Sequence, residues 1–350
     1  MLRAGLSATA LSKGTKMNEL NIKEIVNKFE NLSVGVIGDL ILDSYIWGNA
    51  NRISPEAPVP VVHVNTKNHA LGGAANVINN ICCLGAKCRA YGVVGNDKNG
   101  RELTEMTKAL GSAVDGIIAD GTRCTTVKTR VLAGTQQIVR IDEEDTHFLS
   151  NEVKLLLIDK VKADIDNGLI QGLIFEDYAK GVLDPAMVQH LADYARANGV
   201  LTAMDPHPRH KMNITNLTFI TPNRMEAFAL AGDYFREGIL PITDDAPLMK
   251  VGEILSSKWS PEMLLITLGA HGMSLFRKNQ SVFHIPTLAK AVFDVSGAGD
   301  TVIATLMLSL LADCNGEEAA RVANRAAGVV VGCVGTVPIE QDQLVQSFIG

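Results

Sequence analysis

The regular alternation of strand and helix patterns from residue 152 onward limits the possible folds more than any other feature of the sequence. Apolar residues at helical spacing alternate there with short apolar runs that predict strands. The predicted helices are 152–166, Pro185–Asn198 and Arg224–Ala231, and the predicted strands are Gly172–Glu176, Val200–Asp205 and Leu217–Thr221. Strands connected through helices favour a mostly parallel sheet with helices on both faces. The sequence therefore predicts an α/β fold of three layers.

The composition bounds the size and the partners of such a fold. The chain has 350 residues, of which 47% are hydrophobic and 20% charged, enough for one large α/β domain or two ordinary ones. The net charge is −6 and the charges are scattered, so we expect no nucleic-acid partner. No apolar run reaches the roughly 18 residues of a membrane span, so we expect no membrane partner. The six cysteines lack metal-site spacing and are expected to be reduced thiols in a cytoplasmic protein.

The first sixteen residues are small, polar and basic, and they contain no apolar stretch long enough for a secretory signal. We interpret residues 1–16 as a disordered leader or an artificial extension and exclude them from the fold. Met17 is a plausible start of its own, so the folded region is expected to be 17–350.

A proline-containing excursion interrupts the sheet pattern. Residues Trp47–Pro60 are predicted to be irregular, and Val61–Val64 resumes a strand. Two alternating segments, Thr125–Leu132 and Gln136–Asp142, flank a glycine-containing turn. Together these segments are expected to form a small antiparallel β lid that excludes water from a cleft, and the alternative is an ordinary sheet edge. The lid strands are expected at about 44–64 and 123–142. A further hypothesis is a homodimer in which two lids pair across a two-fold axis.

Acidic residues follow the first predicted strand, Val34–Gly38, at the end where open α/β sheets bind ligands. Asp39 comes directly after this strand, and Asp43 follows four residues later. Each ionised carboxylate accepts two or more hydrogen bonds, which suits the hydroxyl groups of a polyol. A weaker signal is the segment Gly72–Asn76 before a predicted helix, where glycines allow close approach and an amide can bind a sugar hydroxyl. The alternative for these glycines is easier helix packing.

The turn Asp294–Asp300 leads into the apolar run Val302–Ala312 and predicts an anion site. Unpaired N–H groups and the helix dipole make such a helix start favourable for phosphate. The two glycines of the turn are unfavourable in a buried helix start unless a ligand must approach the backbone. Asp300 could accept a proton from a hydroxyl that attacks a phosphoryl group. The alternative is that Asp294 or Asp300 only stabilises the helix start. We favour phosphoryl transfer.

Further polar residues follow the later strands and are expected to share one rim of the sheet. They are Asp177, Lys180, Asp205, Asn223 and Glu226. Asn223 and Glu226 stand three residues apart at a helix start, so both could face a metal-bound water or a phosphate. The equally ready alternative is a capping pair that satisfies the helix N-terminus.

Two of these motifs resemble the signature regions of the ribokinase-like (PfkB) family of carbohydrate kinases. They are Asp294–Asp300 and the upstream Gly72–Asn76, and they occur in the expected order. Within that family, four more segments resemble the heptose 7-phosphate kinases: Val36–Asp43, Arg52–Val61, Asp177–Gly181 and Thr221–Glu226. The likeness covers residues from about 25 to 345. It implies that 17–350 is one ribokinase-like domain, a three-layer α/β/α fold with a mostly parallel central sheet and a small β lid.

The resemblance implies a concrete activity. The family transfers the γ-phosphoryl group of ATP, with Mg²⁺, to a sugar hydroxyl. In the heptose branch the acceptor is the C1 hydroxyl of D-glycero-β-D-manno-heptose 7-phosphate and the product is heptose 1,7-bisphosphate, a step towards ADP-heptose for lipopolysaccharide core or other surface glycans. One alternative is the same fold acting on a ketohexose phosphate or a pentose. Another is a sugar- or nucleotide-sensing protein without catalysis.

The resemblance also implies roles for individual residues. Asp300 is expected to be the base, and the N–H groups of Gly297, Ala298 and Gly299 to hold the transferring phosphoryl group. The residues expected to bind the sugar are Asp39, Asp43, Gly72, Gly73 and Asn76. The cations expected at the sugar's own phosphate are Lys128, Arg130 and Arg140, with Arg52 on the preceding loop. The alternative is that these cations form a solvated strand face. The residues expected at the nucleotide are Lys180, Asn223, Arg224, Met225, Glu226, Thr267, Gly269, Gly272 and Asn324. Mg²⁺ is expected to bind through water near Glu226.

Two departures from the heptose branch bear on these expectations. His207 stands where we expect a lysine, so a cationic contact to phosphate is lost or is supplied by Lys180 or Arg209. Many relatives also continue into a nucleotidyltransferase domain. No second phosphate-binding pattern follows before Gly350, so that activity is expected on another polypeptide.

Overall fold

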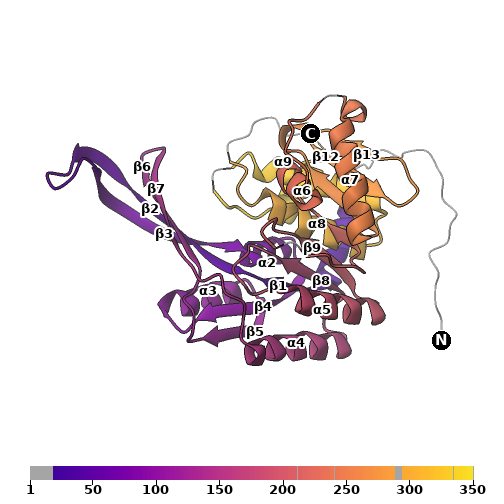
Figure 1. The fold of residues 1–350 in the computed structure, drawn as a ribbon, viewed down its shortest axis with the longest axis horizontal. Helices are drawn as coiled ribbons and strands as arrows, with labels where there is room; N and C mark the ends of the chain where they lie inside the picture. The colour runs from indigo at the N-terminus through magenta and orange to yellow at the C-terminus, as the bar shows by residue number, and fades with distance from the viewer. Residues whose placement is uncertain (1–18, 211, 240, 288–293, 334, 350) are drawn as a thin grey trace.

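The computed structural model describes residues 19–210, 212–239, 241–287, 294–333 and 335–349. The predicted leader at 1–16 lies outside the described residues. Within them, the larger of two sheets has nine strands in the order β13-β12-β11-β10-β9-β8-β1-β4-β5 (Figure 1). Their bounds are β1 Ser33–Gly38, β4 Lys87–Gly95, β5 Ala113–Asp120, β8 Gly172–Glu176, β9 Leu201–Asp205, β10 Phe219–Ile220, β11 Met263–Thr267, β12 Met273–Arg277 and β13 Phe283–Ile285. Neighbours from β5 to β11 pair in parallel, and only β12 and β13 pair antiparallel. The predicted mostly parallel sheet is confirmed.

Helices cover both faces of this sheet, which makes the three layers. The α-helices are α1 Glu19–Lys28, α2 Ala74–Cys83, α3 Lys98–Ala109, α4 Asn151–Asp166, α5 Pro185–Ala197, α6 Arg224–Ala231, α7 Ala246–Trp259, α8 Ala298–Leu311, α9 Gly316–Val330 and α10 Gln341–Gln346. One hydrophobic core contains residues of α1, α2, α8 and α9, for example Val77 and Ile303. A second core contains residues of α4 to α7, for example Leu191 and Phe228. Each core lies on its own side of the sheet because the strands are apolar on both faces.

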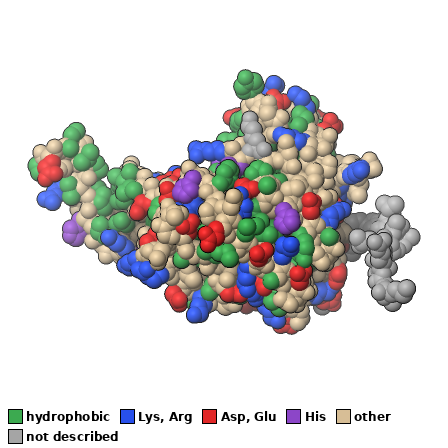
Figure 2. Space-filling model, turned by 60° about the horizontal axis from the view of Figure 1, so that its bottom comes forward, with side chains coloured by type: hydrophobic (Ala, Val, Ile, Leu, Met, Phe, Trp, Pro, Cys, Tyr) green, Lys and Arg blue, Asp and Glu red, His purple; other side chains and the backbone are tan. Residues whose placement is uncertain are grey.

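A second sheet of four strands forms the predicted lid and projects from the body of the molecule (Figures 1 and 2). Its order is β3-β2-β6-β7, with β2 Leu40–Ile53, β3 Pro60–Gly73, β6 Val127–Ala133 and β7 Gln136–Glu143. Two details of the prediction were wrong. The segment predicted to be irregular from Trp47 belongs to strand β2 as far as Ile53, with register shifts after Trp47 and Asn49 that absorb its irregular sequence. The lid is also not purely antiparallel, because β2 and β6 pair in parallel.

Among the described residues, no helix combines the length and the apolar character that crossing a membrane would require.

Candidate active site

The glycine turn positions the start of α8. Gly297 occupies the N-cap with φ of 77°, a left-handed conformation that favours glycine, and a Cβ there would lie 2.7 Å from Asn76 Nδ2. No side chain caps this helix, so its first turn keeps N–H groups available to a ligand. The Ala298 N–H is an exception, because it donates to the Val295 carbonyl at 3.2 Å. The anion site at this helix start stays a prediction. Of the three N–H groups expected to hold the phosphoryl group, that of Ala298 is already hydrogen-bonded within the turn.

The two acids of the turn have different surroundings. Asp294 accepts hydrogen bonds from Ser296 N at 2.9 Å and from Gly335 N at 3.0 Å, so it ties the turn to a later loop. Asp294 therefore has a structural role in the turn, although it does not cap the helix as the alternative for the two acids supposed. Asp300 makes neither contact and faces the interior, where its side chain is 3% exposed.

Asp300 is held by side chains from two distant parts of the chain. Asn76 Nδ2 donates to Asp300 Oδ2 at 2.6 Å, and the Tyr178 hydroxyl donates to Asp300 Oδ1 at 2.8 Å. Burial raises the pKa of Asp300, and the two hydrogen bonds oppose that rise. Asn76, which was predicted to bind the sugar, contacts the predicted base, and its sugar contact stays a prediction. Tyr178 was not predicted as a site residue, since a tyrosine after a strand carries no chemical signal by itself.

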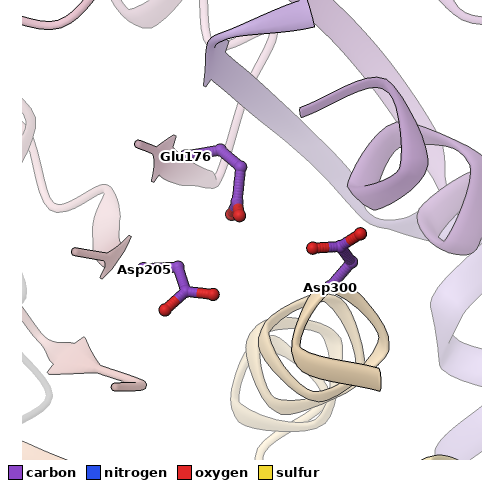
Figure 3. Close-up of side chains that lie close together, drawn as sticks. All are labelled: Glu176, Asp205 and Asp300. Carbon is purple, nitrogen blue, oxygen red and sulfur yellow. The ribbon is translucent and has the colours of Figure 1, made fainter. Parts of the chain in front are cut away.

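Three carboxylates converge beside the turn (Figure 3). Oxygen atoms of Glu176, Asp205 and Asp300 all lie within 4.8 Å of one another. Glu176 is 1% exposed, and neither of its carboxylate oxygens has a hydrogen-bond partner among the described residues. Burial raises the pKa of Glu176 and of Asp205 well above their ordinary values, and the neighbouring carboxylates add to the rise. Buried carboxylates without donors are suited to a proton or a divalent cation, and oxygen is the ligand atom that Mg²⁺ prefers.

Glu176 is therefore the acidic residue that sequence reasoning missed. It is the last residue of the apolar strand β8. The signal was present, since an acid that ends a buried strand lies at the ligand-binding edge of an α/β sheet.

A cavity of about 690 Å³ opens beside this cluster. Its lining includes the glycine turn, the acids Asp205, Glu226 and Asp300, and residues of α9. The residues predicted for the nucleotide that line it are Asn223, Glu226, Thr267, Gly269, Gly272 and Asn324. Residues Gly269–His271 form a single turn of 3₁₀ helix at its edge. The structure thus brings the predicted phosphate turn and most of the predicted nucleotide residues to one cavity.

Asn223 and Glu226 form the capping pair that was the alternative for them. Asn223 Oδ1 accepts from Glu226 N at 3.0 Å, and Glu226 Oε2 accepts from Asn223 N at 2.8 Å. Because both residues also line the cavity, the cap fixes their side chains at its wall. Burial raises the pKa of Glu226 while its bonds to Asn223 oppose the rise.

Three residues predicted to bind the nucleotide do not line the cavity. The Arg224 guanidinium is bound by Asp245, at 2.8 Å for the closest atoms, and donates to the carbonyls of Arg236 and Glu237. Met225 is 63% exposed on the outer side of α6. The Lys180 ammonium pairs with Glu144 at 2.6 Å. The Arg224 guanidinium is thus engaged in a buried ion pair inside the protein, and its nucleotide contact stays a prediction.

The predicted sugar residues lie where β1, the lid and α2 meet. Asp39 is 1% exposed and accepts hydrogen bonds from Tyr178 N, Lys180 N and Val182 N at 2.8, 3.0 and 3.2 Å. These three bonds use most of the acceptor capacity of the Asp39 carboxylate, and a sugar contact of Asp39 stays a prediction. Asp43 pairs with Arg130 at 2.6 Å. A Cβ at Gly72 would lie 2.5 Å from Asp43 Oδ2, and one at Gly73, whose φ is 56°, would lie 2.6 Å from the Asp39 carbonyl oxygen.

Of the three cations predicted for a sugar phosphate, two already have carboxylate partners. Arg130 pairs with Asp43, and Arg140 pairs with Asp142 at 2.8 Å. Lys128 has no carboxylate partner among the described residues, and its ammonium lies 5.1 Å from the centre of the Tyr178 ring. The half-buried His207 does not replace the expected lysine, because burial and then neighbouring cations lower its pKa to about 4.

Comparisons with known proteins were made with the whole chain. The model of the pfkB family carbohydrate kinases matches residues 31–342. The chain is 41% identical over 331 residues to the Bifunctional protein HldE of Pelobacter propionicus, covering 95% of this chain and 66% of that protein. It is 42% identical over 301 residues to the Bifunctional protein HldE of Helicobacter pylori, covering 86% and 63%. The chain thus spans slightly less than two thirds of the length of these relatives.

Solved structures share the fold at low sequence identity. The ribokinase of Thermotoga maritima superimposes with a TM-score of 0.68 at 23% identity, covering 91% of this chain and 99% of that one. Phosphofructokinase-2 of Escherichia coli, in complex with substrates and products, gives a TM-score of 0.72 at 18% identity, covering 91% and 98%.

Proposed function

This chain belongs to the pfkB family of carbohydrate kinases, and from that premise we propose that it phosphorylates the C1 hydroxyl of D-glycero-β-D-manno-heptose 7-phosphate with ATP. The product is heptose 1,7-bisphosphate, a step towards ADP-heptose. The observation that carries the proposal is Asp300, a buried carboxylate beside an uncapped helix start and between the lid and a 690 Å³ cavity. The identity of about 40% to HldE proteins supports the heptose acceptor over other sugars.

We propose a separate task for each residue of the site, and the geometry supports these roles. Asp300 accepts the proton of the attacking sugar hydroxyl, and Asn76 and Tyr178 hold its carboxylate in place. The N-terminus of α8 stabilises the negative charge of the transferring phosphoryl group. ATP occupies the cavity between the 269–272 turn and α9, where Asn324 lies. The lid covers the sugar and excludes water.

A divalent cation fits this site. Glu176 and Asp205 offer buried carboxylate oxygens without hydrogen-bond partners, and Glu226 lies close enough for its charge to act on Asp205. Mg²⁺ bound there would neutralise the charge of the ATP phosphates. We propose Glu176 and Asp205 as its protein ligands, with Glu226 acting through water. The remaining steps depend on the chain's own residues.

A substrate panel tests the acceptor. Purified protein with ATP and Mg²⁺ is expected to phosphorylate heptose 7-phosphate with a kcat/KM at least roughly 100-fold above that for fructose 6-phosphate or ribose. Ribose has no phosphate, and fructose 6-phosphate carries its phosphate on a chain one carbon shorter, so in both cases a cation of the site loses a charged hydrogen bond. Transfer only to fructose 6-phosphate or ribose would exclude the heptose assignment. Binding of ATP without transfer to any sugar would favour a sensor instead of a kinase.

We also propose a homodimer formed by the lids. Figure 2 shows hydrophobic side chains on the projecting lid, and Val64, Val139 and Ile141 there are 43%, 46% and 50% exposed. Apolar side chains on a projecting sheet are typical of an interface. The Ile141→Glu variant is expected to raise the dimer dissociation constant by roughly 30-fold or more, measured by analytical ultracentrifugation.

The matched control for the dimer is Leu155→Glu on α4, a leucine that is 58% exposed and distant from the lid in the fold. It is expected to leave the association unchanged. A wild-type protein that sediments as a monomer at micromolar concentration would contradict the dimer.

We place the protein in the cytoplasm, because its six cysteines are unpaired and ATP is available there.

A further inference from the structure

The loop that carries Tyr178 is fixed by several hydrogen bonds. The loop, residues 177–182, follows β8 directly. Asp39 binds three of its N–H groups, and Asp177 Oδ1 accepts from Ala179 N at 2.9 Å. Arg123 Nη2 donates to the Lys180 carbonyl at 2.8 Å. Five hydrogen bonds to one short loop hold its backbone in a single conformation.

This loop also stores backbone strain beside the tyrosine. Ala179 has φ of 56°, in the left-handed region that non-glycine residues rarely adopt, and it is 5% exposed. Strain of this kind persists only where the surrounding contacts impose it, and it gathers at functional sites. The strained residue is the immediate neighbour of Tyr178, so the strained conformation helps to set the direction of the Tyr178 side chain.

The Tyr178 side chain lies between the base and the lid. Its hydroxyl donates to Asp300 Oδ1 at 2.8 Å, and the Lys128 ammonium of strand β6 lies 5.1 Å from the centre of its ring. The hydroxyl of Tyr178 and the face of its ring therefore contact different parts of the molecule. The backbone of Tyr178 is bound by Asp39, the residue directly before lid strand β2.

We propose that Tyr178 is a positioning residue for Asp300. We also propose that Lys128, on lid strand β6, makes this positioning depend on whether the lid covers the sugar. The inference rests on the proposed kinase function. The tyrosine hydroxyl fixes one carboxylate oxygen, which leaves the remaining lone pairs directed at the acceptor hydroxyl. The lysine stabilises the ring through a cation–π contact when the lid strand is in place. Because Asp300 is then aligned only when the lid covers a bound sugar, transfer of the phosphoryl group to water is limited.

Four variants test the proposal by steady-state kinetics. Tyr178→Phe keeps the ring and is expected to lower kcat by roughly 10- to 100-fold, the value of a hydrogen bond to a charged group, with little change in either KM. Lys128→Met is expected to lower kcat by roughly 3- to 30-fold, and Lys128→Arg to restore most of it, because arginine also binds aromatic faces. The double variant Tyr178→Phe/Lys128→Met is expected to match Tyr178→Phe alone, since both act through one contact.

The chain supplies a matched control on its surface. Lys162 lies 4.5 Å from the centre of the Tyr194 ring, and the Tyr194 hydroxyl donates to Asp166, so the same three residue types repeat far from the cavity. Tyr194→Phe and Lys162→Met are expected to leave kcat and both KM values unchanged. A loss of kcat that appears in the Tyr178 or Lys128 variants and not in these controls is then caused by the contact at the active site.

Three results would overturn the inference. They are an unchanged kcat for Tyr178→Phe, losses that multiply in the double variant, and a Lys128→Met variant that raises only the KM of the sugar, as a direct phosphate contact would. Should Tyr178→Phe fail to fold, the Lys128→Met and Lys128→Arg pair decides the coupling.

A second measurement separates this inference from the proposed function. The melting temperatures of Tyr178→Phe, Asp300→Ala and their double variant form a cycle that measures the contact without turnover, because alanine removes the oxygen that accepts from Tyr178. If wild-type protein phosphorylates none of the sugars, the proposed function fails, while a non-additive cycle still supports the Tyr178–Asp300 contact. An additive cycle would remove it.

Discussion

Asp300→Asn is expected to lower kcat by roughly 10²- to 10⁴-fold, the usual contribution of a general base. The amide has the shape of the carboxylate but cannot accept the proton of the sugar hydroxyl. The KM for ATP is expected to stay within a factor of a few, because the N-terminus of α8 and the cavity wall are unchanged. The measurement is steady-state kinetics with heptose 7-phosphate, together with titration of a non-hydrolysable ATP analogue.

The structure explains why this variant should remain folded. Asn76 donates to Asp300 Oδ2, and Asn76 Oδ1 is buried without a hydrogen-bond partner among the described residues. A flip of the Asn76 amide would let that oxygen accept from the new amide at position 300. A variant that folds, binds the ATP analogue and turns over at the wild-type rate would contradict the role of Asp300 as the base.

Glu176→Gln is expected to raise the melting temperature of the metal-free protein at pH 8 and to abolish most of the stabilisation that Mg²⁺ provides. Removing an unpaired buried charge is favourable without metal, and each kcal/mol gained corresponds to roughly 2 °C or more. With Mg²⁺, the lost ligand removes the gain in stability that metal binding supplies to the folded state. Activity at low Mg²⁺ is expected to fall at least roughly 10-fold, the usual effect of weakening a metal site.

The same pair of proteins gives a pH dependence of known sign. The pKa of Glu176 is raised in the folded state by burial and then by Asp205 and Asp300, so the metal-free folded protein binds more protons than the unfolded chain. Stability is therefore lost as the pH rises above about 4.5, the ordinary pKa of the carboxyl group. The melting temperature of the wild type minus that of Glu176→Gln is expected to fall from pH 5 to pH 8.

The difference in melting temperature between the wild type and Glu176→Gln removes the contribution of other titrating groups, including groups whose pH dependence has the opposite sign. The pKa of His207 is lowered to about 4, so its contribution to stability is lost as the pH falls from about 6.5, its ordinary pKa, towards 4. The matched control is Glu262→Gln. In the wild type the Glu262 carboxylate pairs with Arg196 at the surface at 3.2 Å, and this exposed pair is expected to contribute little to the melting temperature. A difference that does not change with pH, or an unchanged response to Mg²⁺, would exclude Glu176 as a cation ligand.

Much of the fold followed from local patterns. The predicted helices at 152–166 and 185–198 and the strand at 172–176 agree with α4, α5 and β8 within one residue at each end. These elements have strong apolar periodicity and caps formed by side chains next to them in sequence, such as Ser150 and Asp184. The lid was harder, because β2 contains two register shifts that disturb the period of two.

The sequence alone determined the parts of the site that are made by neighbouring residues. The turn 294–300, its left-handed Gly297 and the acid that follows are consecutive, so the backbone conformation that needs glycine and the helix dipole could be derived from the chain. The same holds for the Asn223–Glu226 cap, although sequence could not choose between its two roles.

Only the tertiary structure decided which distant side chains share a contact. Asn76 and Asp300 are 224 positions apart, Arg130 and Asp43 are 87 apart, and Glu176 meets Asp205 and Asp300 through the order of β8 and β9 and the placement of α8. The physical reason is that local backbone preferences act over a few residues. Side-chain pairing between elements depends instead on sheet order, register and the layer that covers each strand, which arise from burial of apolar surface in the whole chain.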